Sequence, residues 1–404
     1  MQIERGKEAA EKFAAERDHF PVLKKEIYFN TPFFGLVPDY VWQATRDNID
    51  DRFYNQNIGV AGMSQYAMID KIRGVYAALL NAEPSDIAFG LSSSQMFCAL
   101  SGNLLVESGD NVVMADNAFI TLPFAFNARE ADGLEVRMAK TAAGYISAED
   151  LCAHADERTK VIAVNHVESG TGYRIDMEYT GNFCRERGII FAVDAVQSAG
   201  AMRIDVERMK IDFLVGSDYK WLMHFRGVGF AYVRPELRKN LGYRCAGWGG
   251  DANLFDTSKR RMDPVDSARR YEYGGFHNIG LYAVSLVIEH YLELGAQDVE
   301  DYILSLADYC YEKSEKSECV GIAYRFAPKN RSGIVVLNVP GQYGLNSDKL
   351  MGYGIRAAVD GGPNPGHGSP PVDNTIRIGL HYFLGKEDID KLFFAIESVC
   401  KGTS

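Results

Sequence analysis

An acidic residue and a lysine follow two short apolar stretches near the middle of the chain. The run Ile189–Val193 ends in Asp194, and the run Phe213–Val215 is soon followed by Lys220. Short continuous apolar runs bounded by polar residues are typical of buried parallel strands. Ligands of open α/β sheets bind at the carboxyl ends of the strands, so we expect Asp194 and Lys220 at one ligand-binding edge.

A carboxylate and a lysine at such an edge suit the chemistry of pyridoxal phosphate. The lysine of such a site forms a Schiff base with the cofactor. The acid keeps the pyridine nitrogen protonated, so that the ring accepts electrons. We therefore interpret Lys220 and Asp194 as a catalytic pair, with pyridoxal phosphate as the predicted cofactor.

A strand followed by small residues precedes this pair in the chain. The apolar run 87–89 leads into a turn that contains Ser93 and Ser94, and helical spacing of apolar residues begins at Met96. A helix N-terminus offers free N–H groups and partial positive charge, which suits a phosphate. Serine is also the ordinary N-cap residue, so a plain helix cap remains the alternative interpretation. The GxGxxG and GxxxxGK[ST] signatures are absent here, which argues against a dinucleotide or nucleoside triphosphate.

The elements that must position these residues alternate between strand and helix from about residue 86 to residue 233. This pattern predicts an α/β fold with a mostly parallel sheet of seven strands. After Trp248 the pattern changes to a smaller α+β region that includes a polar loop at 251–270. The chain of 404 residues exceeds the usual size of a single core. We expect an N-terminal segment (1–45) packed on the small domain, a large cofactor-binding domain (46–255) and a small C-terminal domain (256–404).

Composition limits the classes of partner. The formal net charge of -11 argues against a nucleic-acid partner, and the longest apolar runs are too short to span a bilayer. The seven cysteines have no CxxC spacing, so we predict neither a disulfide framework nor a metal site. These features together favour a cytoplasmic protein.

Three stretches, DAVQSAG, DFLVGSDYKWL and GVGFAYV, resemble the class V aminotransferase family of pyridoxal phosphate enzymes. The family includes cysteine desulfurases, kynureninases and isopenicillin N epimerase-like proteins, and the resemblance runs from about Tyr28 to the last helix. It implies the type I fold of pyridoxal phosphate-dependent transferases. It also implies a homodimer with shared active sites and a small amino acid or keto acid as substrate.

The resemblance implies a role for each matching position. Lys220 forms the Schiff base, Asp194 pairs with the ring nitrogen, and Arg377 clamps the substrate carboxylate. The other implied cofactor contacts are Ser93, Ser94 and Ser217 at the phosphate, Phe119 on the ring face, Glu168, Ser169 and Gln197 near the ring hydroxyl, and Tyr219 beside the lysine. The loop 271–278, which contains Gly275, matches one that reaches the phosphate of the partner subunit. Loop residues expected to face the substrate are Asn30, Tyr54, Trp248 and His367.

Three departures from the family pattern bear on the reaction. Tyr219 stands where the family commonly has histidine, although kynureninases also carry Tyr-Lys. The loop after Val359 contains no cysteine, which argues against a desulfurase because that reaction needs a nucleophilic thiol there. Gly275 replaces a phosphate-binding threonine, which leaves only backbone contacts at that point.

The predicted function is therefore a class V aminotransferase that acts on a small amino acid through Lys220. The first alternative is a lyase or hydrolase of kynureninase or C–S lyase type, which Tyr219 and Trp248 favour. The second is an amino-acid epimerase. The third is a non-enzymatic regulator that has kept the fold, against which the intact pair of Asp194 and Lys220 argues.

Overall fold

The computed structural model describes residues 11–56, 64–254, 256, 258–359 and 375–402. Its centre is a seven-stranded sheet in the order β2-β8-β7-β6-β5-β3-β4. The strands are β2 (Ile87–Gly90), β3 (Asn111–Ala115), β4 (Glu135–Ala139), β5 (Thr159–Asn165), β6 (Ile190–Asp194), β7 (Phe213–Ser217) and β8 (Gly229–Val233). The predicted α/β class with a mostly parallel sheet of seven strands is confirmed. Only β8 runs antiparallel to its neighbours β2 and β7.

The strands read as continuous apolar runs because both faces of the sheet are covered. Side chains alternate between two separate apolar clusters, as the pleat of a strand requires. In β3, Val113 belongs to one cluster, while Val112 and Met114 belong to the other. The first cluster includes residues of α3, α7 and α9, and the second includes residues of α4 and α5.

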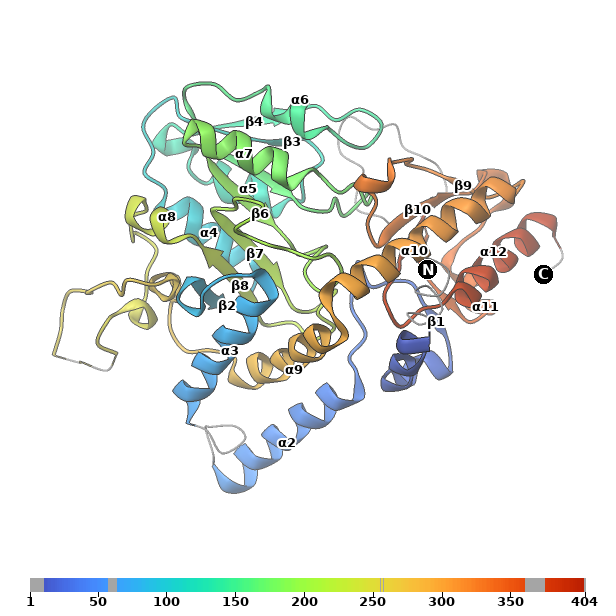
Figure 1. Cartoon of the computed structure of the whole chain (residues 1–404), viewed down its shortest axis with the longest axis horizontal. Helices are drawn as coiled ribbons and strands as arrows, with labels where there is room; N and C mark the ends of the chain where they lie inside the picture. Colours follow the sequence, from blue (N-terminus) through green and yellow to red (C-terminus); the bar gives the residue numbers. More distant parts are fainter. Residues whose placement is uncertain (1–10, 57–63, 255, 257, 360–374, 403–404) are drawn as a thin grey trace.

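Eleven labelled helices are found in the described residues. They are α2 (Asp39–Asn55), α3 (Gln65–Leu80), α4 (Ser93–Asn103), α5 (Thr121–Asn127), α6 (Ala148–Cys152), α7 (Met177–Arg187), α8 (Pro235–Asn240), α9 (Asn278–Leu294), α10 (Ala296–Lys316), α11 (Ser347–Gly352) and α12 (Lys386–Lys401). Figure 1 shows α9 and α10 running from the large sheet toward the C-terminal elements. They therefore link the two sheet regions.

A second, four-stranded sheet lies in the C-terminal part, in the order β12-β13-β10-β9. Its strands are β9 (Gly321–Ile322), β10 (Ile334–Asn338), β12 (Ala358–Val359) and β13 (Thr375–Gly379), and all its pairings are antiparallel. Nearby, β11 (Ile355–Arg356) pairs in parallel with β1 (Ile27–Tyr28) from the N-terminal segment. Phe13 and Phe20 of that segment are buried against Tyr302, Tyr382 and Phe383. The division into domains at residues 45 and 255 stays a prediction.

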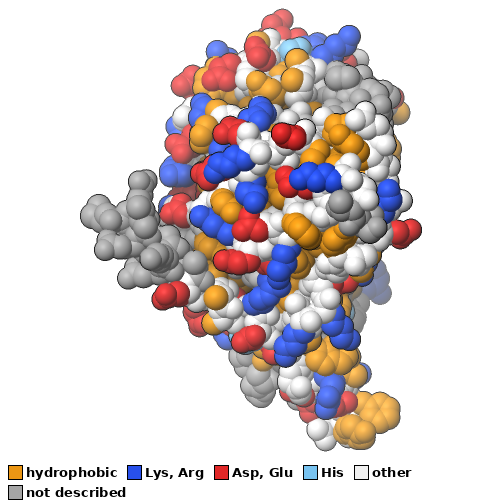
Figure 2. All heavy atoms as spheres, turned by 90° about the vertical axis from the view of Figure 1, so that its right-hand side faces the viewer, with side chains coloured by type: hydrophobic (Ala, Val, Ile, Leu, Met, Phe, Trp, Pro, Cys, Tyr) orange, Lys and Arg blue, Asp and Glu red, His pale blue; other side chains and the backbone are white. Residues whose placement is uncertain are grey.

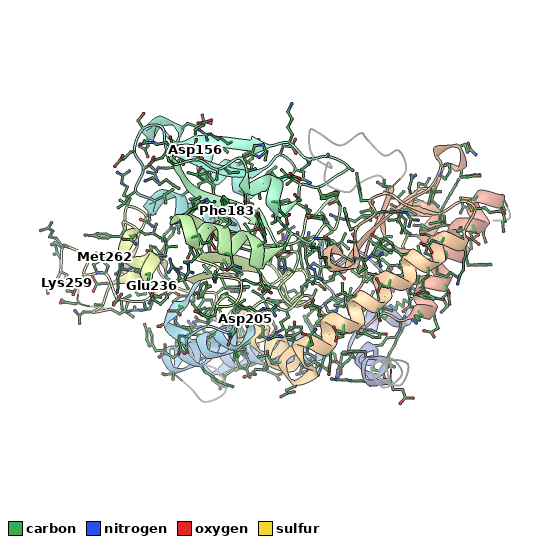
Figure 3. The ribbon with its side chains drawn as sticks, turned by 45° about the horizontal axis from the view of Figure 1, so that its top comes forward. Asp156, Phe183, Asp205, Glu236, Lys259 and Met262 are labelled. Atoms are coloured by element: carbon green, nitrogen blue, oxygen red, sulfur yellow. The ribbon has the colours of Figure 1, made fainter. Side chains whose placement is uncertain are left out.

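The surface carries mixed charge. Figure 2 shows Lys and Arg side chains interspersed with Asp and Glu on the side that α10 and α12 occupy in Figure 1. An ion pair joins α10 to α12, with Nζ of Lys313 2.8 Å from Oδ1 of Asp390. Figure 3 shows Lys259 and Met262 in the loop that protrudes on the opposite side. The predicted polar loop at 251–270 is thus a surface feature.

No single helix in the described residues is long and apolar enough to cross a membrane. Taken together, α9 and α10 have the length and composition of a span, but they meet at a bend of 82°. All seven cysteines are free. The cytoplasmic location stays a prediction.

Candidate active site

Asp194 and Lys220 lie at one edge of the large sheet. Asp194 is the last residue of β6, and it pairs with Val215 in the adjacent parallel strand β7. Lys220 is the third residue after Ser217, the last residue of β7. Both side chains are buried, with exposed fractions of 3% and 7%. The edge predicted from the apolar runs is therefore where the structure places the pair.

Burial changes the protonation of both groups. It lowers the pKa of Lys220 to about 8, although the negative charge of Asp194 works in the opposite direction. Burial also raises the pKa of Asp194 to about 6, offset in part by the N–H of Val196, which donates to Oδ1 at 2.8 Å, and by Lys220. A lysine with this pKa is neutral in a substantial fraction of molecules near pH 8, and a neutral amine is a nucleophile.

A cavity of about 100 Å³ opens at this edge. Nine of the predicted cofactor contacts line it: Ser93, Ser94, Phe119, Ser169, Asp194, Gln197, Ser217, Tyr219 and Lys220. Four residues without a predicted role line it too: Ser92, Thr121, Asn165 and Val196. Asn165 ends β5 and so shares the strand-end signal of Asp194, whereas Thr121 gave no such signal.

The N-terminus of α4 faces this cavity with hydroxyl groups around it. Ser92 caps the helix, its Oγ accepting from the N–H of Gln95 at 3.2 Å. The hydroxyls of Ser94 and Thr121 are 2.9 Å apart, and the N–H of Ser93 donates to Oγ of Ser217 at 3.4 Å. The first turn of α4 contains no acidic residue. The N–H groups of the first turn, the helix dipole and the hydroxyls together suit a phosphate.

Phe119 provides an aromatic face opposite the lysine. Nζ of Lys220 lies 5.6 Å from the centre of its ring. The backbone N–H of Phe119 donates to Oδ1 of Asn165 at 3.0 Å, so the end of β5 fixes the position of the ring. A flat ligand between Phe119 and the end of β6 would stack on this ring.

The segment 29–35, which we call the N-terminal strap, is bonded to three parts of the site. The N–H of Gly35 donates to the carbonyl of Tyr219 at 2.8 Å, and the carbonyl of Phe29 accepts from Gly379 at 2.7 Å. The carbonyl of Pro32 accepts from Nε2 of Gln197 at 3.0 Å. The strap therefore joins the segment 218–224 that carries Lys220, which we call the lysine loop, to β13.

Gln197 uses its other amide atom inside the protein. Its Oε1 accepts from Nε1 of Trp221 at 2.8 Å. Because Nε2 has two hydrogens and one of them is bound to Pro32, a single N–H remains for a ligand. Gln197 lines the cavity while tying the strap to the residue after Lys220.

Arg377 lies in β13 with 3% of its surface exposed. Its Nη1 donates to the carbonyl of Ser169 at 2.7 Å, while its buried Nε has no partner. Within the described residues it takes part in no ion pair, and burial lowers its pKa to about 10. A buried guanidinium with an unused N–H calls for an anionic partner, because an unpaired buried donor is costly.

Arg377 and five other predicted residues do not line this cavity. Glu168 lies behind Asn165 in an adjoining cavity of about 10 Å³, where burial raises its pKa well above the usual range. Asn30 lies in the strap, with Oδ1 buried and without a partner. Gly275 lines a separate cavity of about 340 Å³, and a Cβ added at Gly274 would contact the indole of Trp248. Tyr54 is exposed near the end of α2.

His367 lies outside the described residues. No group of His, Cys, Asp and Glu side chains in the described part is arranged to hold a metal ion.

Comparison with known proteins places the chain in a family. The model of the family described as "Aminotransferase class-V" matches residues 35–392, so the chain belongs to this family. The family depends on pyridoxal phosphate, which confirms the cofactor predicted from the sequence.

Curated relatives are similar over nearly the whole chain. The uncharacterized aminotransferase YcbU from Bacillus subtilis (strain 168) is 25% identical over 92% of this chain and 94% of its own. A probable cysteine desulfurase from Pyrococcus abyssi is 26% identical, covering 95% and 97%. The relatives thus carry names from two reaction types.

Solved structures confirm the predicted type I fold. The apo cysteine desulfurase from Thermococcus onnurineus NA1 has a TM-score of 0.84 at 23% identity, covering 96% of this chain and 97% of its own. A lysine-to-alanine mutant of C-DES, solved with glycine covalently linked to its pyridoxal phosphate, has a TM-score of 0.82 at 19% identity. It covers 94% of this chain and 98% of its own.

Proposed function

We propose that the protein is a pyridoxal phosphate-dependent aminotransferase that acts on a small amino acid. The observation that carries this proposal is one cavity that joins a buried Lys220–Asp194 pair to the N-terminus of α4. Arg377, a buried cation with an unused N–H, lies in β13, which the strap connects to the segment that carries Lys220. These groups match the aldehyde, ring nitrogen and phosphate of the cofactor and the carboxylate of a substrate.

The residues fit the cofactor in the following way. Lys220 would hold it through Nζ, and Asp194 would face its ring nitrogen. Ser93, Ser94 and Ser217, with the first turn of α4, would bind its phosphate, while Phe119 would stack on its ring. Ser169 and the free N–H of Gln197 remain for the ring hydroxyl. Bound there, pyridoxal phosphate supplies an electron-accepting ring that stabilises negative charge at the substrate α-carbon.

Two side chains, Arg377 and Lys220, would act on the substrate during transamination. Arg377 would bind the substrate carboxylate in a bidentate pair and so orient the Cα–H bond toward Lys220. Once released by the incoming amine, Lys220, whose pKa burial lowers to about 8, would accept the α-proton through the neutral form of Nζ. If Lys220 passed this proton to the cofactor rather than back to the α-carbon, water would release a keto acid and the amino group would stay with the cofactor.

A lyase is the second candidate, and two observations favour it. Several relatives are named probable cysteine desulfurases, and Tyr219 stands beside Lys220 with its ring in the cavity wall. A desulfurase that uses its own thiol is disfavoured, because the sequence has no cysteine between Cys319 and Cys400. An epimerase would instead return a proton to the α-carbon, on the face opposite to the one that lost it. The buried Lys220–Asp194 pair argues against a regulator without activity.

We also propose a homodimer that shares its active sites. Gly275 has open space at its Cβ position, and the adjacent Tyr273 is exposed. This loop is free to contact a second copy. Sedimentation of the purified protein would measure its oligomeric state directly.

Product analysis tests the reaction. Purified protein with cofactor is given single amino acids, with and without a keto-acid acceptor, and keto acid, ammonia, sulfide and the enantiomer are measured. Keto acid that forms only with an acceptor supports the aminotransferase. Ammonia or sulfide without an acceptor would show the lyase, and racemised substrate the epimerase. Lys220→Ala should abolish every product, and a variant as active as the parent would refute the proposal.

A further inference from the structure

A second arginine stands beside the catalytic lysine. Arg226 lies in the loop between Lys220 and β8 and is exposed. Its guanidinium carbon is 4.4 Å from the ring centre of Phe34 and 4.9 Å from that of Tyr219. Tyr219 lines the Lys220 cavity, and Phe34 belongs to the strap. Two aromatic rings therefore hold Arg226 next to the site.

The positive charge of Arg226 is not balanced by a neighbouring acid. Within the described residues, Arg226 makes no ion pair. Asp218, the nearest acid along the chain, is buried and bound to His224 at 2.8 Å. Asp194 faces the cavity and offsets Lys220. After burial, the positive charges of Arg377 and Arg226 also lower the pKa of Lys220, in keeping with the contact of Arg226 with the neighbouring ring of Tyr219.

We propose that Arg226 binds the side-chain carboxylate of a dicarboxylic amino acid whose α-carboxylate is bound by Arg377. This inference rests on the proposed function and narrows its substrate class to acidic amino acids. A dicarboxylate neutralises two cations that the described residues leave without an anion, whereas a neutral amino acid neutralises one. Stacking on Phe34 and Tyr219 leaves the edge of the guanidinium free, and a planar fork of N–H groups matches a carboxylate.

Non-reacting ligands separate this inference from the proposed function. The cofactor-loaded protein is titrated calorimetrically with succinate, which has two carboxylates, and with butyrate, which has one. We expect the parent protein to bind succinate at least about 10-fold more tightly. Arg226→Gln should weaken the binding of succinate about 10- to 100-fold, because a hydrogen bond to a charged group is lost, and should leave the binding of butyrate unchanged. Arg226→Lys should keep part of the preference because it keeps the charge.

Two further variants complete the design. Arg325→Gln removes another exposed arginine that lies near an aromatic ring, that of Tyr311. It should change the affinity for neither ligand. Arg377→Gln should weaken the binding of both ligands. If it leaves the binding of butyrate unchanged, Arg377 does not clamp a carboxylate as the proposed function requires. The ratio of the affinities for succinate and butyrate still reports on Arg226 in that case.

Turnover gives a second measurement. The ratio of kcat/KM for aspartate to that for alanine should fall about 10- to 100-fold in Arg226→Gln. The inference is overturned if succinate binding and this ratio are unchanged in Arg226→Gln. It is also overturned if Arg226→Gln weakens the binding of succinate and butyrate equally, because Arg226 would then stabilise the pocket without binding the second carboxylate. The visible absorbance of bound cofactor shows that each variant is folded.

Discussion

Nδ1 of His224 lies 2.8 Å from Oδ2 of Asp218, and both side chains are almost completely buried. The backbone N–H of His224 also donates to the carbonyl of Asp218, at 3.2 Å. These two contacts close the short loop that carries Lys220. The pair holds the lysine in place by bonds made entirely outside the cavity wall.

Breaking this pair should cost stability. Asp218→Ala removes the buried carboxylate from Nδ1 of His224 and leaves this atom only the carbonyl of Phe225, at 2.9 Å. We expect a loss of about 3 kcal/mol in the free energy of unfolding. The exposed pair of His19 and Asp39, with the same chemistry at 2.9 Å, provides the control. Asp39→Ala should cost less than about 1 kcal/mol. Denaturant unfolding of the cofactor-free protein measures both losses of unfolding free energy. Equal losses in the two variants would show that burial of the pair adds nothing to stability.

The reactivity of Lys220 should follow its lowered pKa. The rate at which cofactor-free protein forms a borohydride-trapped adduct with pyridoxal phosphate should rise with pH, with a midpoint near the pKa of about 8. Asp194→Asn should move this midpoint to lower pH, because the charge of Asp194 raises the pKa of Lys220. Lys220→Met should remove the adduct at this position. A midpoint near that of an ordinary lysine, about 10.4, would contradict the buried environment.

Asp194 should lower the stability of the cofactor-free protein at neutral pH. Its folded-state pKa of about 6 is raised by burial, so unfolding releases a proton between about pH 4 and 6. Stability therefore falls as pH rises through this window, and the cost is complete above it. Asp194→Asn should stabilise the cofactor-free protein by about 2 kcal/mol at pH 7.5 and by little at pH 4. The same variant should bind pyridoxal phosphate more weakly, and stabilisation that is equal at both pH values would refute this account.

Gly35 should tolerate no side chain. A Cβ at this position would lie 1.9 Å from the carbonyl oxygen of Lys220. Gly35→Ala should therefore displace the lysine loop, costing about 1–3 kcal/mol and weakening cofactor binding. Gly74, inside α3, has nothing within 4 Å of a Cβ. Gly74→Ala should stabilise the protein by about 0.5–1 kcal/mol, and thermal unfolding with cofactor titration distinguishes the two.

The sequence pattern predicted the parts of the site that depend on local order. Asp194, Ser217 and Ser93 lie where they were expected because strand ends and helix starts are visible as changes from apolar to polar residues. The antiparallel direction of β8 was not predicted, since a buried apolar run looks the same in either direction.

Contacts between distant segments were not visible in the pattern. Nothing near Gln197 indicates that its amide joins Pro32 to Trp221. Likewise, Arg226 looks like an ordinary surface residue until Phe34 is brought beside it. Glu168 was predicted beside the cofactor and Trp248 beside the substrate, but tertiary packing places their side chains outside the Lys220 cavity.

The N-terminal strap determines when the site can exist during synthesis. Phe29, in the first tenth of the chain, is bonded to Gly379, in the last tenth, two residues beyond Arg377. A ribosome-bound chain therefore cannot complete the substrate clamp until β13 has emerged. Contacts of such long sequence separation form late, because closing the loop costs entropy before the contact stabilises anything. The large sheet can fold first, so the nascent protein would gain a cofactor-binding edge before it gains the ability to hold a substrate.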